Sequence, residues 1–219
     1  MFLTKITDKG LTIICELVKL EVLGLGNTTV TSVGLPFLTN LRSLRHLDLT
    51  GTDIDDSGMS AIEDICSLQT IFLSGTKVSD RGMQHLRPLL SLIEILLPSN
   101  FTGAGLTYLD ALPHLECLDF RKTKVTDAGL VYLCQMGNLK IINLEGTSIG
   151  DNGLNNLSHL TNLQWLDLSG TKVADSGLAY LQNLPQLAIL RLQSTKVTDS
   201  GLRFLKELNG LRSLFLGYT

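Results

Sequence analysis

One phrase recurs along the whole chain and constrains what it can fold into. It appears as LDLTGTDIDDSGMSAIEDICS (47–67), LDFRKTKVTDAGLVYLCQMGN (118–138), LDLSGTKVADSGLAYLQNLPQ (166–186) and LRLQSTKVTDSGLRFLKELNG (190–210). Aligned on their leucines, the repeats begin at Leu20, Leu44, Leu68, Leu92, Leu115, Leu139, Leu163 and Leu187, with partial repeats over 1–19 and 211–219. Each full repeat has 24 residues, except the one from Leu92, which is one residue short. A sustained period of about 20–29 residues around an LxxLxL core indicates a solenoid of stacked repeats.

Within one repeat the pattern changes from strand to helix. In LQWLDL (163–168) Leu166 and Leu168 alternate with Trp165 and Asp167, which indicates a half-buried strand. In GLAYLQNL (177–184) leucines recur every three residues, which predicts one apolar stripe on a short helix. Asp175 directly precedes that helix, so we expect its carboxylate to accept the helix's free backbone N–H groups. The missing Cβ of Gly177 would let neighbouring repeats approach closely.

A threonine also recurs, at the turn after the strand. We expect its hydroxyl to form a ladder to backbone groups of the next repeat. These residues are Thr28, Thr52, Thr76, Thr123, Thr147, Thr171 and Thr195. Asn100 takes the same position in the short repeat, where we expect it to be buried.

Stacking decides the predicted fold, because one repeat alone buries too few aliphatic side chains to offset the entropy of ordering it. Parallel strands pair at about 4.8 Å, whereas helices need about 8–10 Å, so the array bends with its strands inside the curve. The prediction is an α/β right-handed solenoid with a parallel β-sheet on its concave face and short α-helices on its convex face. Residues 1–219 are expected to form a single domain.

The repeats resemble the leucine-rich-repeat superfamily over essentially the whole chain. Within it, TKVTDAGLVYL (123–133) is similar to the cysteine-containing repeats of F-box proteins, with their ITDxGLxxL segment, and to related bacterial repeats. This sequence departs from them by having Thr where Asn or Cys is usual, and no F-box-like helical segment precedes its repeats. The resemblance implies binding of a protein partner on the concave surface, and does not imply ubiquitin ligation for this sequence.

The composition restricts the kinds of partner and the location that we expect for this protein. A net charge of −3 argues against nucleic-acid binding, which normally uses clustered Lys and Arg. No apolar run approaches the ~20 residues of a membrane span, and the N-terminal sequence lacks the pattern of a signal peptide. The four cysteines show no CxxC spacing, which favours reduced thiols and a cytoplasmic protein. Because Met1 and Thr219 fall within predicted strand and turn positions, we expect either a fragment of a longer array or self-association through uncapped ends.

The candidate binding surface consists of the outward-facing strand positions. Ile141, Trp165 and Ile189 are consecutive in the third position of their repeats, so they predict an apolar ridge across adjacent strands. An aromatic anchor with a polar rim is typical of a binding hot spot. The alternative is that these apolar residues only support one another laterally. The remaining candidates, in the third and fifth positions, are Asn143, Asp167, Arg191, Asp119, Phe72, His46 and Asp48.

Catalytic chemistry is not indicated. Cys117 lies three repeats from His46, or on the order of 14 Å at ~4.8 Å per strand, which is too far for a nucleophile and its base. The other histidines are scattered, and no phosphate-binding glycine motif occurs, so we expect no metal, no cofactor and no enzyme. Two alternatives to a simple protein-interaction module stay open. One is the recognition part of a larger enzyme or ubiquitin-ligase subunit, and the other is a secreted receptor fragment, to which N-x-[ST] triplets at Asn27, Asn100 and Asn156 are relevant.

Overall fold

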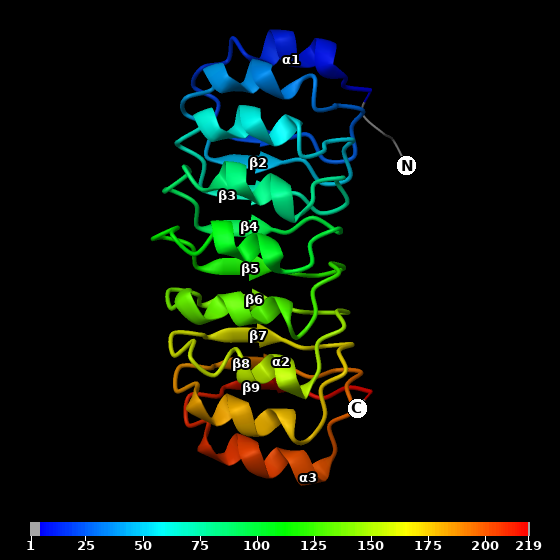
Figure 1. Ribbon diagram of the computed structural model, residues 1–219, viewed down its shortest axis with the longest axis vertical. Coiled ribbons are helices and arrows are strands. Elements are labelled where there is room, and N and C mark those ends of the chain that lie inside the picture. The colour runs from blue at the N-terminus through cyan, green and yellow to red at the C-terminus, as the bar shows by residue number, and fades with distance from the viewer. Residues whose placement is uncertain (1–4, 219) are drawn as a thin grey trace. The chain divides into compact units, whose positions relative to one another are not determined.

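A computed structural model describes residues 5–218. The chain divides into two compact units, one formed by Met1–Phe101 with Gly105–Leu115 and the other by Thr102–Ala104 with Glu116–Thr219. In both units a strand, a turn, a short helix and a return segment form one coil, which then repeats (Figure 1). That residues 1–219 form a single domain stays a prediction. The terminal residues Met1 and Thr219, on which the expectation of a longer array depends, lie outside the described residues.

The first unit has four described strands, which pair in chain order and in parallel. Each strand begins two residues after the first leucine of a predicted repeat. Equivalent residues of neighbouring repeats face one another, as in His46↔Thr70. In chain order its elements are α1 (Asp8–Ile14), β1 (Val22–Gly24), the 3₁₀-helix η1 (Leu35–Asn40), β2 (His46–Asp48), η2 (Gly58–Asp64), β3 (Thr70–Phe72), η3 (Asp80–Leu86), β4 (Glu94–Leu96) and η4 (Ala104–Tyr108), whose first residue is counted with the second unit.

The second unit repeats this plan. Its strands also pair in parallel and in chain order, with Ile141↔Trp165 and Trp165↔Ile189 in register. Its elements are β5 (Cys117–Asp119), η5 (Gly129–Gln135), β6 (Ile141–Asn143), α2 (Asp151–Asn155), β7 (Trp165–Asp167), η6 (Gly177–Asn183), β8 (Ile189–Arg191), α3 (Asp199–Leu202), η7 (Arg203–Glu207) and β9 (Ser213–Phe215).

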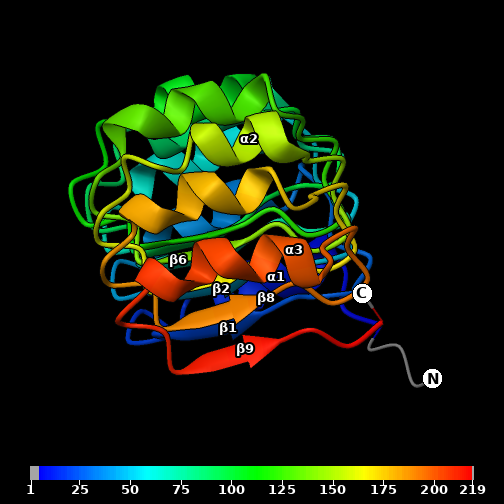
Figure 2. The ribbon, with the colours of Figure 1, turned by 90° about the horizontal axis from the view of Figure 1, so that it is seen from below.

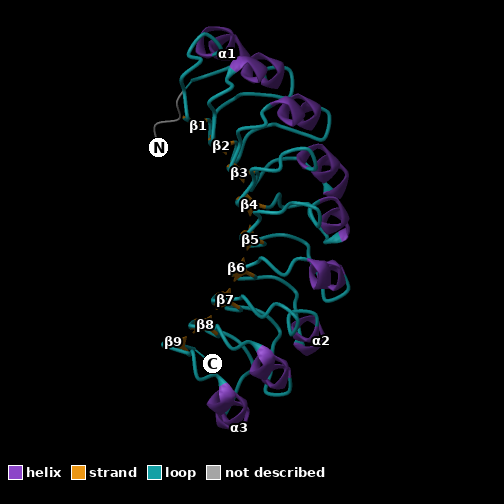
Figure 3. Ribbon diagram, turned by 90° about the vertical axis from the view of Figure 1, so that its left-hand side faces the viewer, coloured by secondary structure: helices purple, strands orange, loops and turns teal. Residues whose placement is uncertain are grey.

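The predicted α/β solenoid is confirmed. Within each unit the strands lie on one side and the helices on the other (Figures 2 and 3). Most helical segments of the described chain are 3₁₀-helices rather than the expected α-helices. A 3₁₀-helix rises about 2.0 Å per residue instead of 1.5 Å, so a segment of five to seven residues crosses more of the coil's width.

The core fills the space between the strand and helix layers. It consists of the middle residue of most strands, such as Leu166, and of the helix leucines, such as Leu178 and Leu181, all with no exposed surface. This is the arrangement that the alternation in 163–168 and the three-residue spacing in 177–184 predict.

The aspartates before the helices bind the next coil rather than their own helix, which corrects the expected capping role. Asp56 accepts hydrogen bonds from the backbone N–H and the hydroxyl of Ser79, at 2.7 Å and 2.6 Å. The same bond to a backbone N–H joins Asp8 to Thr31, Asp127 to Gly150, Asp151 to Ala174 and Asp175 to Thr198. At η3 and α3 the hydroxyl that binds the aspartate caps the helix instead: Ser79 Oγ accepts from the backbone N–H of Arg81, and Thr198 Oγ1 accepts from that of Ser200.

The recurring glycine makes room for this ladder of carboxylates. A Cβ added to Gly177 would lie 2.6 Å from Oδ1 of Asp151, closer than real Cβ atoms come to a neighbour. The close approach predicted at Gly177 is therefore present, and the group that it admits is the carboxylate of the preceding coil.

The turn threonines also differ from expectation. The hydroxyl of Thr171 donates to the carbonyl of Leu168 in its own coil, at 2.6 Å, and Thr52, Thr76, Thr123 and Thr147 do the same three residues back. These threonines are buried at the turn, and the carbonyl that accepts the hydroxyl also accepts the backbone N–H of the same threonine. The buried hydroxyl is thereby satisfied within its own turn. It closes each turn locally and does not join two coils.

The short repeat keeps its core by moving one side chain inward. Phe101 has no exposed surface and takes the buried position that Val78 holds one coil earlier, whereas Asn100 is exposed rather than buried. The missing residue corresponds to the exposed Lys77. The deletion therefore removes a surface position and leaves the interior filled.

Candidate partner-binding surface

Ile141, Trp165 and Ile189 lie side by side on β6, β7 and β8, as their registered pairs show. We call these three residues the Trp165 ridge. Ile141 is 40 % exposed, and Trp165 and Ile189 are half-buried. The next residue of each strand points into the core and is buried. Trp165 is therefore a surface side chain with one accessible side and not part of the interior.

Arg191 is held between two aromatic rings beside the ridge. Its guanidinium carbon lies 5.7 Å from the ring centre of Trp165 and 4.9 Å from that of Phe215, which is 40 % exposed. Nη1 of Arg191 also lies 3.7 Å from Oδ2 of the buried Asp167. These two cation–π contacts and the ion pair restrict the Arg191 side chain, which in turn lies against the ring of Trp165. Sequence reasoning did not include Phe215, although it occupies the position of Arg191 in the next repeat.

Asp119, Asn143 and Asp167 contribute little accessible surface. They are 7 %, 8 % and 2 % exposed, and Oδ1 of each accepts the backbone N–H of the residue two positions further on, at 2.8–3.0 Å. These polar side chains close the turn at the end of each strand, where a backbone donor would otherwise be unpaired. They support the ridge from beside it and leave most contact surface to Trp165, Arg191 and Phe215.

Asp119 carries a second interaction. Nη2 of Arg121 lies 2.8 Å from Oδ2 of Asp119, and this hydrogen bond raises the pKa of the Arg121 guanidinium. The strand face thus presents a paired, exposed guanidinium one coil before the ridge begins.

A polar hollow of about 350 Å³ adjoins Arg191, where β6, β7 and β8 end. Asp167, Ser169, Gln193 and Tyr218 line it with Arg191. A partner side chain lying on the ridge can therefore meet hydrogen-bonding groups next to it.

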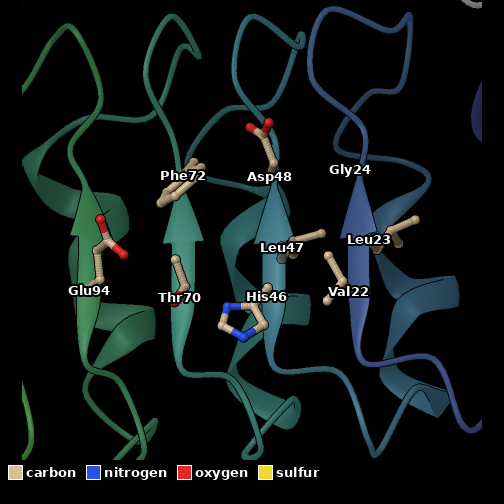
Figure 4. A pocket seen from close by; sticks show the side chains of 9 residues that line it. All are labelled: Val22, Leu23, Gly24, His46, Leu47, Asp48, Thr70, Phe72 and Glu94. Atoms are coloured by element: carbon tan, nitrogen blue, oxygen red, sulfur yellow. The ribbon is translucent and has the colours of Figure 1, made fainter.

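In the first unit, His46 and Asp48 on β2 lie beside Phe72 on β3. They line a hollow of about 340 Å³ on the strand face, together with Val22, Gly24 and Glu94 (Figure 4). His46 is exposed, and Asp48 and Phe72 are half-buried. The ten predicted residues therefore form two groups: three around this hollow, and seven on and beside the ridge in the second unit.

Three other features are absent from the residues that the structure describes. Residues 5–218 contain no group of three or more His, Cys, Asp or Glu side chains placed to hold a metal ion. None of the four cysteines, all of which are described, forms a disulfide. Within the same residues, no helix is both long enough and apolar enough to cross a bilayer.

Comparison with known proteins agrees with the geometry. Residues 3–219 match a family described as a leucine-rich repeat region. The chain belongs to the leucine-rich repeat family. Among solved structures, internalin C2 from Listeria monocytogenes strain 4b F2365 is similar, with a TM-score of 0.71 and 23 % sequence identity over 96 % of this chain and 84 % of its own.

The plant peptide hormone receptor RGFR1, solved in complex with RGF2, is similar with a TM-score of 0.58 and 18 % identity. That match covers 94 % of this leucine-rich repeat chain and 37 % of the receptor chain. At these identities the likeness concerns the fold alone. A comparison with curated protein sequences found no match.

Proposed function

We propose that this leucine-rich repeat chain is a protein-binding module whose second unit holds its partner on the Trp165 ridge. The observation that carries the proposal is the placement of the chain's single tryptophan. Trp165 lies half-exposed on the strand face, between the side chains of Ile141 and Ile189, with Arg191 stacked against it.

The physical argument is one of preorganisation. A tryptophan buries a large apolar area when a partner covers it, and Trp and Arg are enriched in the few residues that dominate binding energy. Because Arg191 lies against the Trp165 ring and itself contacts Phe215, less conformational entropy is lost on binding than for a free side chain. The buried Asp167 keeps the guanidinium in place from below.

The fold comparison supports binding of a polypeptide. RGFR1, whose repeats share this fold, was solved in complex with RGF2. The partner of this chain and the face that it uses are our proposal.

The test is affinity purification from the native source with wild type, Trp165→Ala and Tyr180→Ala in parallel. Tyr180 is the matched control, because it is 36 % exposed in the same unit but belongs to η6 on the helix side. We expect Trp165→Ala to lower affinity for the partner by at least ~2 kcal/mol, or about thirtyfold, with an unchanged circular dichroism spectrum. Equal recovery with Trp165→Ala, or an equal loss with Tyr180→Ala, would show that the assigned surface is wrong.

A second candidate is the recognition part of a larger enzyme or ubiquitin-ligase subunit, supported by the finer resemblance of 123–133 to F-box-type repeats. Reading the gene on both sides of the segment for residues 1–219 separates this candidate from a stand-alone module. A cytoplasmic location, supported by the four free thiols, also stays a proposal. Glycans on native Asn27, which is exposed, would instead support a secreted receptor.

Self-association through the ends is also a proposal. Leu214, the middle residue of β9, is 38 % exposed, whereas the equivalent Leu190 of β8 is buried. An apolar side chain at the edge of β9 could pack against a coil of a second copy. Sedimentation at two protein concentrations would test this.

A further inference from the structure

The hollow in the first unit is lined by one aromatic ring and two carboxylates. Phe72 on β3 lies beside Asp48 on β2, and Glu94 on β4 lies beside Thr70, diagonally from Phe72. The side chains of Asp48, Phe72 and Glu94 all line the hollow on the strand face (Figure 4). Adjacent strands are separated by about 4.8 Å, so a group lying over the Phe72 ring is within reach of Asp48 on the neighbouring strand. The carboxylate of Glu94, diagonally placed on β4, adds a second negative charge to the same hollow. No lysine or arginine lines the hollow.

Asp48 is held in place. Its Oδ1 accepts the backbone N–H of Thr50 at 2.8 Å, and its Oδ2 lies beside Gly26, where an added Cβ would be 3.0 Å from it. Oδ2 of Asp48 accepts no hydrogen bond from the residues that the structure describes. A carboxylate fixed through one oxygen can offer the other to a ligand without a further loss of side-chain entropy.

Space for a long side chain comes from Gly24. It occupies on β1 the position of Asp48 on β2, and a Cβ added there would meet nothing within 4 Å. Val22, on the same strand, is 63 % exposed and supplies an apolar wall. An unbranched aliphatic stem can therefore lie along β1 and carry its end group toward Phe72 and Asp48.

This combination selects a particular chemistry. A carboxylate beside an exposed aromatic ring attracts a cation, and the cation–π contribution adds to the ion pair. A planar guanidinium can stack on the ring while it donates to the carboxylate edge-on, whereas an ammonium group offers only a point charge. The apolar wall suits the methylene stem of the same side chain.

We infer that the hollow around Phe72 and Asp48 is a docking site for an arginine side chain of a protein partner. The inference concerns only the first unit and goes beyond the proposal for the Trp165 ridge. It shares with that proposal the premise that the strand face binds protein. Its test uses no protein partner, so the two can fail separately.

The probe is N-acetyl-arginine methylamide, titrated into the ¹⁵N-labelled chain of residues 1–219 and followed through the backbone amide resonances of Thr70 and Phe72. N-acetyl-citrulline methylamide is the neutral control of nearly the same shape, and N-acetyl-lysine methylamide tests charge without the planar fork. We expect saturable shifts with the arginine amide. Both control amides should bind at least about fivefold more weakly.

Three variants locate the site. Asp48→Asn keeps the acceptor for Thr50 but loses the charge, and Phe72→Leu keeps an apolar floor but loses the ring; each should weaken arginine binding about fivefold. Gly24→Leu should abolish it by filling the hollow. Gly137→Leu is the matched control, since a Cβ there also meets nothing within 4 Å and Gly137 lies in the other unit. It should leave arginine binding unchanged.

Four results would overturn the inference. They are the absence of saturable shifts, equal affinity for arginine and citrulline amides, equal affinity for arginine and lysine amides, and unchanged arginine binding in Gly24→Leu. The amide spectrum of each variant reports its fold directly. If Gly24→Leu unfolds the first unit, the Asp48→Asn and Phe72→Leu titrations decide the question.

Discussion

The carboxylate of Asp56 links two coils, and its removal should destabilise the first unit. Asp56→Ala eliminates two hydrogen bonds to Ser79, at 2.7 Å and 2.6 Å. A hydrogen bond to a charged group contributes about 1.5–3 kcal/mol. Because Asp56 is only half-buried, we take less than the sum of the two and expect the free energy of unfolding to fall by about 2–3 kcal/mol.

Asp53→Ala is the control in the same coil. The Asp53 carboxylate pairs with Nζ of Lys77 at 2.5 Å, but both side chains are more than half exposed. Exposed ion pairs contribute little, so this change should cost no more than about 0.5 kcal/mol. Both variants lose one negative charge and one contact to the next coil, so the difference between them isolates the part-buried hydrogen bonds from Asp56 to Ser79.

A double-mutant cycle with Ser79→Ala tests the assignment of the partner. Ser79 also accepts a hydrogen bond from the backbone N–H of Arg81, so its own removal carries an additional capping cost. The Asp56 and Ser79 side chains should nevertheless couple by about 1 kcal/mol, because they share one bond across 23 residues of sequence.

The assay is urea denaturation followed by far-ultraviolet circular dichroism, with slopes compared to confirm that the transition is unchanged. If the aspartates acted only as caps of their own helices, Asp56 and Ser79 would not couple. A coupling energy below about 0.3 kcal/mol, or equal costs for Asp56→Ala and Asp53→Ala, would refute the reasoning.

Two further predictions concern the same unit. Phe101→Ala should lower the free energy of unfolding by about 3–5 kcal/mol because it opens a cavity in the core, whereas Leu90→Ala, at a side chain that is 55 % exposed, should cost less than about 1 kcal/mol in the same urea titration. Hydrogen bonds from Ser57 and then Ser32 lower the pKa of Asp55 from 3.8 to about 2. A carboxyl whose pKa is lower in the folded than in the unfolded state stabilises the fold at pH values above its unfolded pKa. The difference in the free energy of unfolding between wild type and Asp55→Asn should therefore be constant above about pH 4 and should shrink as the pH falls toward 2. An advantage that grows with acidification in denaturation midpoints would contradict this assignment.

The candidate surface was predictable in its outline. A strand shows alternate residues on opposite faces, so the repeat alignment alone places Ile141, Trp165 and Ile189 together and directs them away from the core. The structure has all three in these positions. What the pattern could not predict is how much of each polar neighbour stays accessible. Asp167 is 2 % exposed because its backbone turn and Arg191 cover it, and both are properties of the folded surface.

Two predictions about hydrogen bonds, those of the aspartates and of the turn threonines, were wrong because they too depend on the folded structure. Local rules predicted that an aspartate before a helix caps that helix and that a turn threonine reaches the next coil. In the structure the aspartate reaches the next coil and the threonine bonds its own. Both groups satisfy the nearest unpaired backbone partner, and which partner is nearest depends on the offset between stacked coils. The offset does not appear in the sequence of a single repeat.

The sequence by itself therefore determined the period, the strand and helix faces and the leucines of the core, because these depend on spacings within one coil. Tertiary structure alone decided which carboxylates join coils, where Phe101 moves when its repeat loses a residue, and how Trp165, Arg191 and Phe215 stack. Each of those outcomes is a contact between residues from different coils or a response to neighbouring coils. Their geometry exists only once the coils are packed.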